Sequence, residues 1–225
     1  MSKESSRPGD TTGNTYTDPG ADTPEGYEIS RRSRMLARAA VGDATVEDRI
    51  RQRCAIAVGD FAMADLLRFR HGPVAAALMA LDQGAPILAD IRMVATGIQK
   101  KGHRSRVCVA LDYGKALVDE RGITRTSAGF LDLASRLDGA LVVIGNAPSA
   151  LLTVCSLVQN GKKPAVVIGT PVGFINAAES KALLRTLEVP SISTEGTRGG
   201  TPVAVAAANE IITLFLERSH AGPGD

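Results

Sequence analysis

The sequence predicts a three-layer α/β fold, in which a mostly parallel β-sheet is covered by helices on both faces. Two observations carry this prediction. Short apolar runs, such as ALVVIG (140–145) and AVVIG (165–169), are bounded by Gly and Pro. Each run is followed by a helical pattern of about ten residues or more, which is typical of βαβ units. We therefore expect a single α/β domain with its sheet buried on both sides.

The first part of the chain is predicted to be helical. Apolar residues spaced three and four positions apart indicate helices at 27–40 and 46–69, and a further helix at 74–81 follows Gly72 and Pro73. Strands are expected at 85–90, 107–112, 140–145, 165–169 and 190–194, and helices at 114–120, 127–137, 149–159, 177–187 and 203–217.

Both ends of the chain differ in composition from the middle. Residues 1–25 are almost entirely Ser, Thr, Gly, Pro, Asp and Asn, so they cannot bury enough apolar surface to offset the cost of ordering. We expect a disordered tail at 1–25, the α/β domain at 26–218 and a short C-terminal tail at 219–225.

Composition excludes several classes of protein. The net charge of +2 is too small to indicate a nucleic-acid partner, and no basic run is interleaved with aromatic residues. No apolar run reaches about 18 residues, which argues against a membrane span, and the N-terminus lacks the apolar core of a signal peptide. Cys54, Cys108 and Cys155 are odd in number and widely spaced, as expected of reduced thiols in a cytoplasmic protein.

A ligand crevice is expected beyond the carboxyl ends of the strands, because open parallel sheets bind ligands there. The relevant loops follow Asp90, Asp112, Gly145, Gly169 and Thr194. The sequence lacks the glycine-rich fingerprints GxGxxG and GxxxxGK[ST], so these loops do not indicate a nucleotide site.

Glycine and arginine dominate these loops. Gly199 and Gly200 follow Arg198 and open into a helix, which favours an anion site at the helix N-terminus; a tight strand-to-helix turn explains the glycines equally well. Arg92, Arg125 and Arg198 near the crevice indicate a ligand with several carboxylates, unless they are scattered surface residues.

Four segments stand out as motifs: DIRMVATGI (90–98), RGITRTSAGFLDLASRLDGALVVIGNAPSAL (121–151), PAVVIGTPVGFINAAESK (164–181) and TRGGTPVAVAAANEI (197–211). They resemble the corresponding segments of the precorrin-8X methylmutase family, and YEISRRS (27–33) and GDFAMADLLRF (59–69) extend the resemblance toward the N-terminus. The resemblance covers about residues 26–216, and the combination of GNAP, PVGF, NAAESK and RGG is highly specific.

The resemblance implies a homodimer without metal or cofactor. It also implies a step of cobalamin biosynthesis in which a methyl group moves from C-11 to C-12 of a tetrapyrrole that carries many acetate and propionate groups. The matching positions that become candidate ligand contacts are Arg125, Asn146, Ser149, Gly173, Phe174, Arg198, Gly199 and Gly200, beside Arg92 at the crevice edge. Ser149 could instead serve only as a helix N-cap.

The chain departs from the family at the position of the catalytic acid. The family segment usually reads I-H-A-T-G-D, whereas residues 55–60 read AIAVGD, so Ile56 stands in place of the histidine and Val58 in place of threonine. Asp60 is a candidate replacement acid, because a carboxyl group in an apolar pocket can have a raised pKa. His71, His103 and His220 are expected to be exposed, and Cys54 to pack in the interior.

Three functions therefore remain open: a precorrin isomerase with another acid or none, an isomerase recruited to a different substrate, and a tetrapyrrole-binding protein without catalysis. We expect a cleft at a dimer interface, lined by Ile56, Asn146 and Arg198. A smaller and less charged substrate would leave the crevice arginines paired with protein carboxylates or with solvent.

Overall fold

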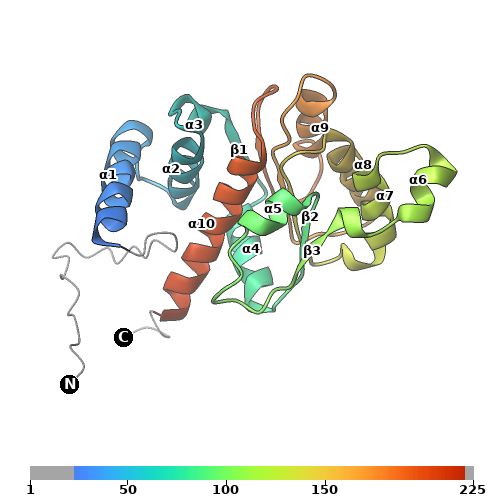
Figure 1. Ribbon diagram of the computed structural model, residues 1–225, viewed down its shortest axis with the longest axis horizontal. Coiled ribbons are helices and arrows are strands. Elements are labelled where there is room, and N and C mark those ends of the chain that lie inside the picture. Colours follow the sequence, from blue (N-terminus) through green and yellow to red (C-terminus); the bar gives the residue numbers. More distant parts are fainter. Residues whose placement is uncertain (1–22, 221–225) are drawn as a thin grey trace.

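The computed structural model describes residues 23–220 (Figure 1). Most of the predicted tails therefore lies outside the described residues, but the inner limits of both were wrong. Helix α1 (Pro24–Val41) already begins at Pro24, because the Thr23 hydroxyl accepts a hydrogen bond from the Gly26 N–H at 3.1 Å and caps the first turn. At the other end, α10 (Thr201–His220) continues to His220.

The sheet confirms the predicted α/β class and its mostly parallel arrangement. Its six strands follow the order β1-β6-β5-β4-β2-β3, and all neighbours are parallel except β1 and β6. The strands are β1 (Leu67–Arg70), β2 (Ile87–Ala89), β3 (Val107–Val109), β4 (Leu141–Ile144), β5 (Val166–Gly169) and β6 (Ser191–Thr194).

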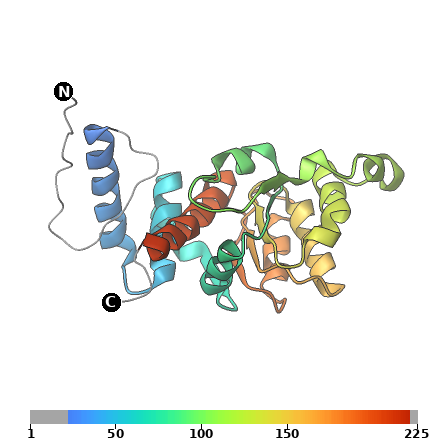
Figure 2. The ribbon, with the colours of Figure 1, turned by 90° about the horizontal axis from the view of Figure 1, so that it is seen from below.

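Helices cover both faces of the sheet, as predicted. One face packs against α4 (Pro73–Asp82), α5 (Arg92–Gly97) and α10, and the other against α7 (Arg125–Asp132), α8 (Pro148–Gln159) and α9 (Ala177–Leu184). Beyond α10, α2 (Val46–Val58) and then α1 extend the first layer outward, as Figures 1 and 2 show. The short elements α3 (Ala62–Leu66), α6 (Lys115–Arg121), η1 (Ala110–Asp112) and η2 (Leu133–Arg136) lie in the connections.

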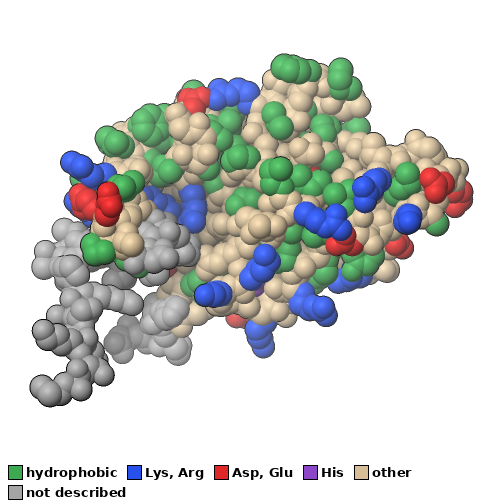
Figure 3. Space-filling view, viewed as in Figure 1, with side chains coloured by type: hydrophobic (Ala, Val, Ile, Leu, Met, Phe, Trp, Pro, Cys, Tyr) green, Lys and Arg blue, Asp and Glu red, His purple; other side chains and the backbone are tan. Residues whose placement is uncertain are grey.

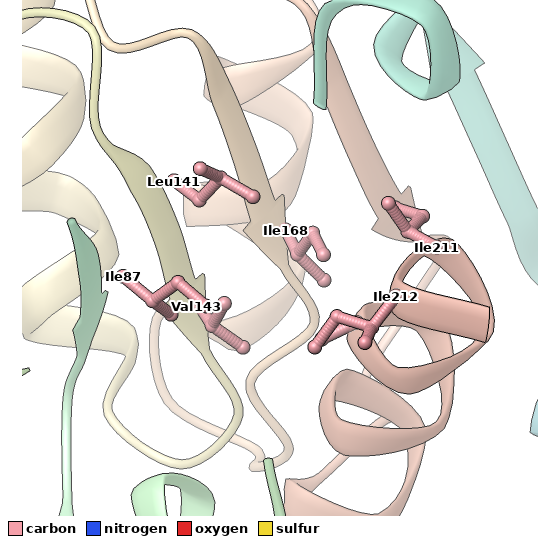
Figure 4. A pocket seen from close by; sticks show the side chains of 7 residues that line it. Ile87, Leu141, Val143, Ile168, Ile211 and Ile212 are labelled. Carbon is pink, nitrogen blue, oxygen red and sulfur yellow. The ribbon is translucent and has the colours of Figure 1, made fainter. Parts of the chain in front are cut away.

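The central strand β4 is apolar at every position because both of its faces are buried. Leu141 and Val143 point into the core beneath α10, whereas Val142 and Ile144 point into the core beneath α7 and α8. Ile211 and Ile212 of α10 face the strand side chains across a cavity of about 10 Å³ (Figure 4). This space is apolar and about the size of one water molecule, so it belongs to the packed core.

The segment predicted as one helix over 46–69 is the main error in the fold. Helix α2 ends at Val58 and is capped by Gly59, whose φ of 65° is left-handed, and the chain then forms α3 and strand β1. Pairing of β1 with β6 overrides the helical spacing of the apolar residues. The other differences are smaller: α5 was not expected, the strand predicted at 107–112 ends at Val109, and the helix predicted at 177–187 ends at Leu184.

No helix within residues 23–220 has both the length and the apolar composition needed to cross a bilayer.

Candidate active site

The loops at the carboxyl edge of the parallel strands are bound to one another. The Asp90 carboxylate follows β2 and accepts the backbone N–H groups of Asn146 and Ala147, at 2.8 and 3.0 Å, from the loop after β4. The Thr170 N–H donates to the Ile144 carbonyl, which joins the loop after β5 to the end of β4. The loops after β2, β4 and β5 therefore lie together at the carboxyl edge of the sheet, where the sequence predicted the crevice.

Asp90 is completely buried beneath these loops. Burial raises the pKa of its carboxyl group, and the backbone N–H groups of Asn146 and Ala147 oppose that rise. The bonds hold the loop so that the Asn146 side chain is exposed at the edge of the sheet.

A cleft of about 320 Å³ lies between α2 and α10. It is lined by Arg53, Ile56, Ala57, Pro202, Val205, Ala206 and Asn209. Ile56 is half-buried and lines this cleft instead of packing in a separate core. Asn146 and Arg198 do not line the cleft, so the three residues predicted to meet there are not brought together.

Arg198 instead contacts the end of α2. Its guanidinium forms an ion pair with Asp60, and the two side chains are 48% and 39% exposed. The hydrogen bond from Arg198 lowers the pKa of the Asp60 carboxyl group. The expectation that apolar surroundings would make Asp60 an acid was therefore wrong, because the group is exposed and paired with a cation.

The turn from β6 to α10 is as tight as its glycines suggested. A Cβ atom on Gly199 would lie 2.3 Å from the Thr170 carbonyl oxygen, so a larger residue does not fit. The Gly200 N–H donates to the same oxygen at 2.7 Å. This N–H is therefore not available to an anion, and the tight approach of the turn to the β5 loop accounts for both glycines.

Lys181 supports this turn from below and was missed by the analysis of the sequence. Its buried ammonium group donates to the Arg198 carbonyl at 2.7 Å and to the Thr194 hydroxyl at 3.0 Å. Burial, together with the nearby Arg185 charge, lowers the pKa of Lys181 to about 8. The available signal was its spacing, because Lys181 lies on the apolar face of α9 with Ala177 and Leu184.

A second group of residues surrounds the start of α7 and α8. Ala147 is the N-cap of α8, so the suggestion that Ser149 caps this helix was wrong. The hydroxyl groups of Ser149 and Thr124 instead lie 2.9 Å apart and link the two helix starts. Arg125, the first residue of α7, is exposed beside them.

The other candidate contacts lie at the periphery of these loops. Arg92 forms an ion pair with Asp112. The Gly173 N–H donates to the Thr197 carbonyl at 3.1 Å, which places the loop after β5 against the β6–α10 turn. Phe174 next to it is 90% exposed, and hydrophobic side chains are visible at the tip of the loop above α9 in Figure 3.

Comparison with known proteins decides the family. Residues 28–214 match the family model for precorrin-8X methylmutase. The chain belongs to the precorrin-8X methylmutase family. The cobalt-precorrin-8 methylmutase of Methanothermobacter thermautotrophicus is 42% identical over 205 residues, which cover 88% of this chain and 98% of the relative. The precorrin-8X methylmutase of Pseudomonas aeruginosa is 38% identical over 199 residues, covering 84% of this chain and 96% of the relative.

The fold of a precorrin-8X methylmutase has also been solved. The crystal structure of the Thermus thermophilus protein superimposes with a TM-score of 0.79 at 34% identity, covering 85% of this chain and 97% of that chain. The fold class and the family resemblance that the sequence predicted are thus confirmed.

Neither His71 nor His103 of this chain lines the α2–α10 cleft. His71 is in the turn after β1, near Glu188. His103 is half-buried, contrary to expectation, and its Nε2 lies 2.7 Å from the Gln99 carbonyl oxygen. The His220 side chain lies outside the described residues. Within residues 23–220, no group of three or more His, Cys, Asp and Glu side chains could hold a metal ion.

Cys54 packs beneath the cleft, as predicted. It is fully buried, its Sγ lies 3.6 Å from the Val203 carbonyl oxygen, and burial raises the pKa of its thiol to about 12. A thiol in this environment stays protonated and unreactive at neutral pH.

Proposed function

We propose that this chain is an isomerase of cobalamin ring biosynthesis that moves a methyl group from C-11 to C-12 of a tetrapyrrole without a histidine acid. The observation that carries the proposal is the position of Ile56, which lines the α2–α10 cleft in a member of the precorrin-8X methylmutase family. The reaction breaks the C-11–methyl bond as the C-12–methyl bond forms, so the product is an isomer and no oxidant or reductant is consumed.

The lining of the cleft supports a reaction without a protein acid. Arg53 is the one ionisable residue among the described residues that line it, and an arginine does not donate a proton at neutral pH. Asp60 is an unsuitable donor, since the Arg198 guanidinium lowers the pKa of its carboxyl group. General acid catalysis typically contributes about 10²–10⁴ in rate, and this chain works without that contribution. Its catalysis then comes from binding that holds the ring in its reacting geometry.

The substrate carboxylates are held by arginines at the edge of the sheet. Arg125 is exposed at the start of α7, next to the linked Ser149 and Thr124 hydroxyl groups. Arg92 and Arg198 exchange their exposed partners, Asp112 and Asp60, for substrate carboxylates when the ligand binds. A guanidinium exchanges one carboxylate for another at little net cost when both pairs are open to solvent.

We also propose that the protein acts as a cytoplasmic homodimer. Phe174 and Ile175 are 90% and 78% exposed in the loop that packs against the β6–α10 turn, which supports a subunit interface next to the site. Cys54, Cys108 and Cys155 are free thiols, which supports a reducing compartment.

One observation favours a second function, an isomerisation of a smaller and less charged substrate. Two of the three crevice arginines are paired with protein carboxylates, Arg92 with Asp112 and Arg198 with Asp60. A ligand with few carboxylates leaves both pairs in place, and the apolar lining around Ile56 suits such a molecule.

The test is to incubate the purified protein anaerobically with precorrin-8X and to follow the absorption change to hydrogenobyrinic acid. We expect slow turnover by the unaltered protein and a rate about 10²-fold higher, or more, in an Ile56→His variant. Ile56→Asn is the matched control, because asparagine is polar and of similar size to histidine but cannot act as an acid.

Each alternative has its own outcome. Equal rates for the unaltered protein and Ile56→His would mean that another group supplies the proton. Binding without turnover, with turnover restored by histidine, would identify a non-catalytic tetrapyrrole-binding protein. Absence of binding by all three proteins would favour the second function.

A further inference from the structure

A buried ion cluster joins the three helices around the α2–α10 cleft. Glu210 of α10 is completely buried and accepts hydrogen bonds from Arg34 of α1, Arg49 of α2 and Arg53 of α2, at 2.9, 2.9 and 3.0 Å. Glu217, about two helical turns further along α10, also binds Arg49. Burial alone would raise the pKa of Glu210, but the surrounding guanidinium groups lower it, so the carboxylate stays ionised.

Arg53 differs from the other members of the cluster because it also lines the cleft. Its Nη1 donates to both Glu210 and the Thr213 hydroxyl, at 3.0 and 3.3 Å, and its side chain is 18% exposed. Two bonds to a single nitrogen fix the plane of the guanidinium. Arg53 therefore lines the cleft while Glu210 and Thr213 hold its guanidinium in place.

The arrangement of charge along the cleft matches an amphiphilic ligand. Ile56 and Val205 form part of its apolar lining, and Arg53 lies one helical turn before Ile56. Outside this lining, Arg198 contacts Asp60 just past the C-terminal end of α2. On the face shown in Figure 3, basic side chains lie over α2 next to hydrophobic surface. An apolar ring system that carries carboxylates at its rim fits this order of side chains.

We propose that Arg53 binds a carboxylate of the ligand in the α2–α10 cleft and that Glu210 is a positioning residue that holds Arg53 for this contact. This inference rests on the proposed function for the identity of the ligand, but not for the chemistry of the contact. A carboxylate that reaches Arg53 places the apolar ring against Ile56, so the residue sets the depth and orientation of binding.

The experiment measures binding of hydrogenobyrinic acid and, separately, of coproporphyrin III, a planar tetrapyrrole with a propionate on every ring. The variants are Arg53→Gln, Arg53→Lys and, as the matched control, Arg49→Gln. Arg49 binds the same Glu210 carboxylate but does not line the cleft. We expect Arg53→Gln to raise the Kd about tenfold or more, Arg53→Lys to restore part of the loss, and Arg49→Gln to change the Kd less than about twofold.

The positioning role of Glu210 is tested by coupling. Glu210→Gln should weaken binding in the unaltered protein but have no further effect in the Arg53→Gln background, whereas a general structural role would weaken both equally. Thr213→Val, which removes the second acceptor of Arg53 Nη1, replaces Glu210→Gln in this cycle if circular dichroism shows that the latter does not fold.

The outcomes separate the two proposals. If Arg53→Gln and Arg49→Gln weaken binding equally, or if neither does, the role of Arg53 is refuted while the proposed function stands. Binding of coproporphyrin III that depends on Arg53, without turnover of precorrin-8X, would refute the proposed isomerase but support the carboxylate site. A protein that binds neither tetrapyrrole would refute both.

Discussion

Arginine and carboxylate meet at two places along α2, just past its C-terminal end at Asp60 and within the helix at Arg53, but the two contacts differ in environment. Arg198 and Asp60 are about half exposed, and their attraction is weakened by solvent. Arg53 binds Glu210, which is completely buried and shared with two further arginines. The comparison indicates that the first contact can exchange with a ligand, whereas the second maintains the arrangement of the helices.

The largest effect is expected from removing the buried carboxylate. Glu210→Ala removes the completely buried carboxylate that three largely buried arginines share, so we expect the free energy of unfolding to fall by about 3–5 kcal/mol. Urea denaturation measures the change. The matched variant Asp60→Ala should cost less than about 1 kcal/mol. Equal losses for the two variants would remove the distinction between the buried and the exposed contact.

A smaller loss is expected at the turn that carries Arg198. Gly199→Ala places a Cβ atom 2.3 Å from the Thr170 carbonyl oxygen and should destabilise the fold by about 1–3 kcal/mol. Thermal unfolding of this variant can be compared with that of Gly196→Ala, since a Cβ atom on Gly196 has nothing within 4 Å although its φ is 66°. The comparison separates the steric clash from the backbone strain, and a greater loss at Gly196 would contradict the close approach.

The lysine beneath this turn makes stability depend on pH. The pKa of Lys181 is about 8 when folded, below its ordinary value of 10.5, so the unfolded chain binds more protons between these values. Stability should therefore gain a contribution from Lys181 as the pH rises through this range. Chemical denaturation from pH 7 to 10.5 should show a flatter profile for Lys181→Met. The exposed-lysine control Lys115→Met should retain the profile of the unaltered protein, and a retained profile in Lys181→Met would exclude this lysine as its source.

The smallest effect on stability is expected from Asp60→Asn, but this variant sharpens the comparison most directly. Removing the Asp60 charge frees Arg198 from an exposed partner, so we expect hydrogenobyrinic acid to bind a few-fold more tightly at low salt. Titration at low and high ionic strength measures this gain, which should shrink as salt is added. Weaker binding at low salt would mean that Asp60 orients Arg198 instead of competing for it.

The strands show how far local pattern extends. Apolar runs at β2, β4 and β5 could be recognised because strands buried on both faces are apolar at every position. Strand β1 could not, because its residues follow a helical spacing and become a strand only through pairing with β6. The same limit applies to Ser149, because the sequence placed it near a helix start but could not reveal that its hydroxyl group contacts Thr124 instead of capping the helix.

Some features of the candidate site could likewise be predicted from the sequence, and others depend on the fold. The sequence alone determined the family, the glycines of the β6–α10 turn and the apolar residue at position 56, because each is a property of contiguous residues. Only the tertiary structure decided that Arg198 pairs with Asp60, 138 residues away, and that Arg53 binds Glu210, 157 residues away. Charged side chains carry no local signal of their partners, since an ion pair forms wherever folding brings opposite charges together and burial then determines its strength.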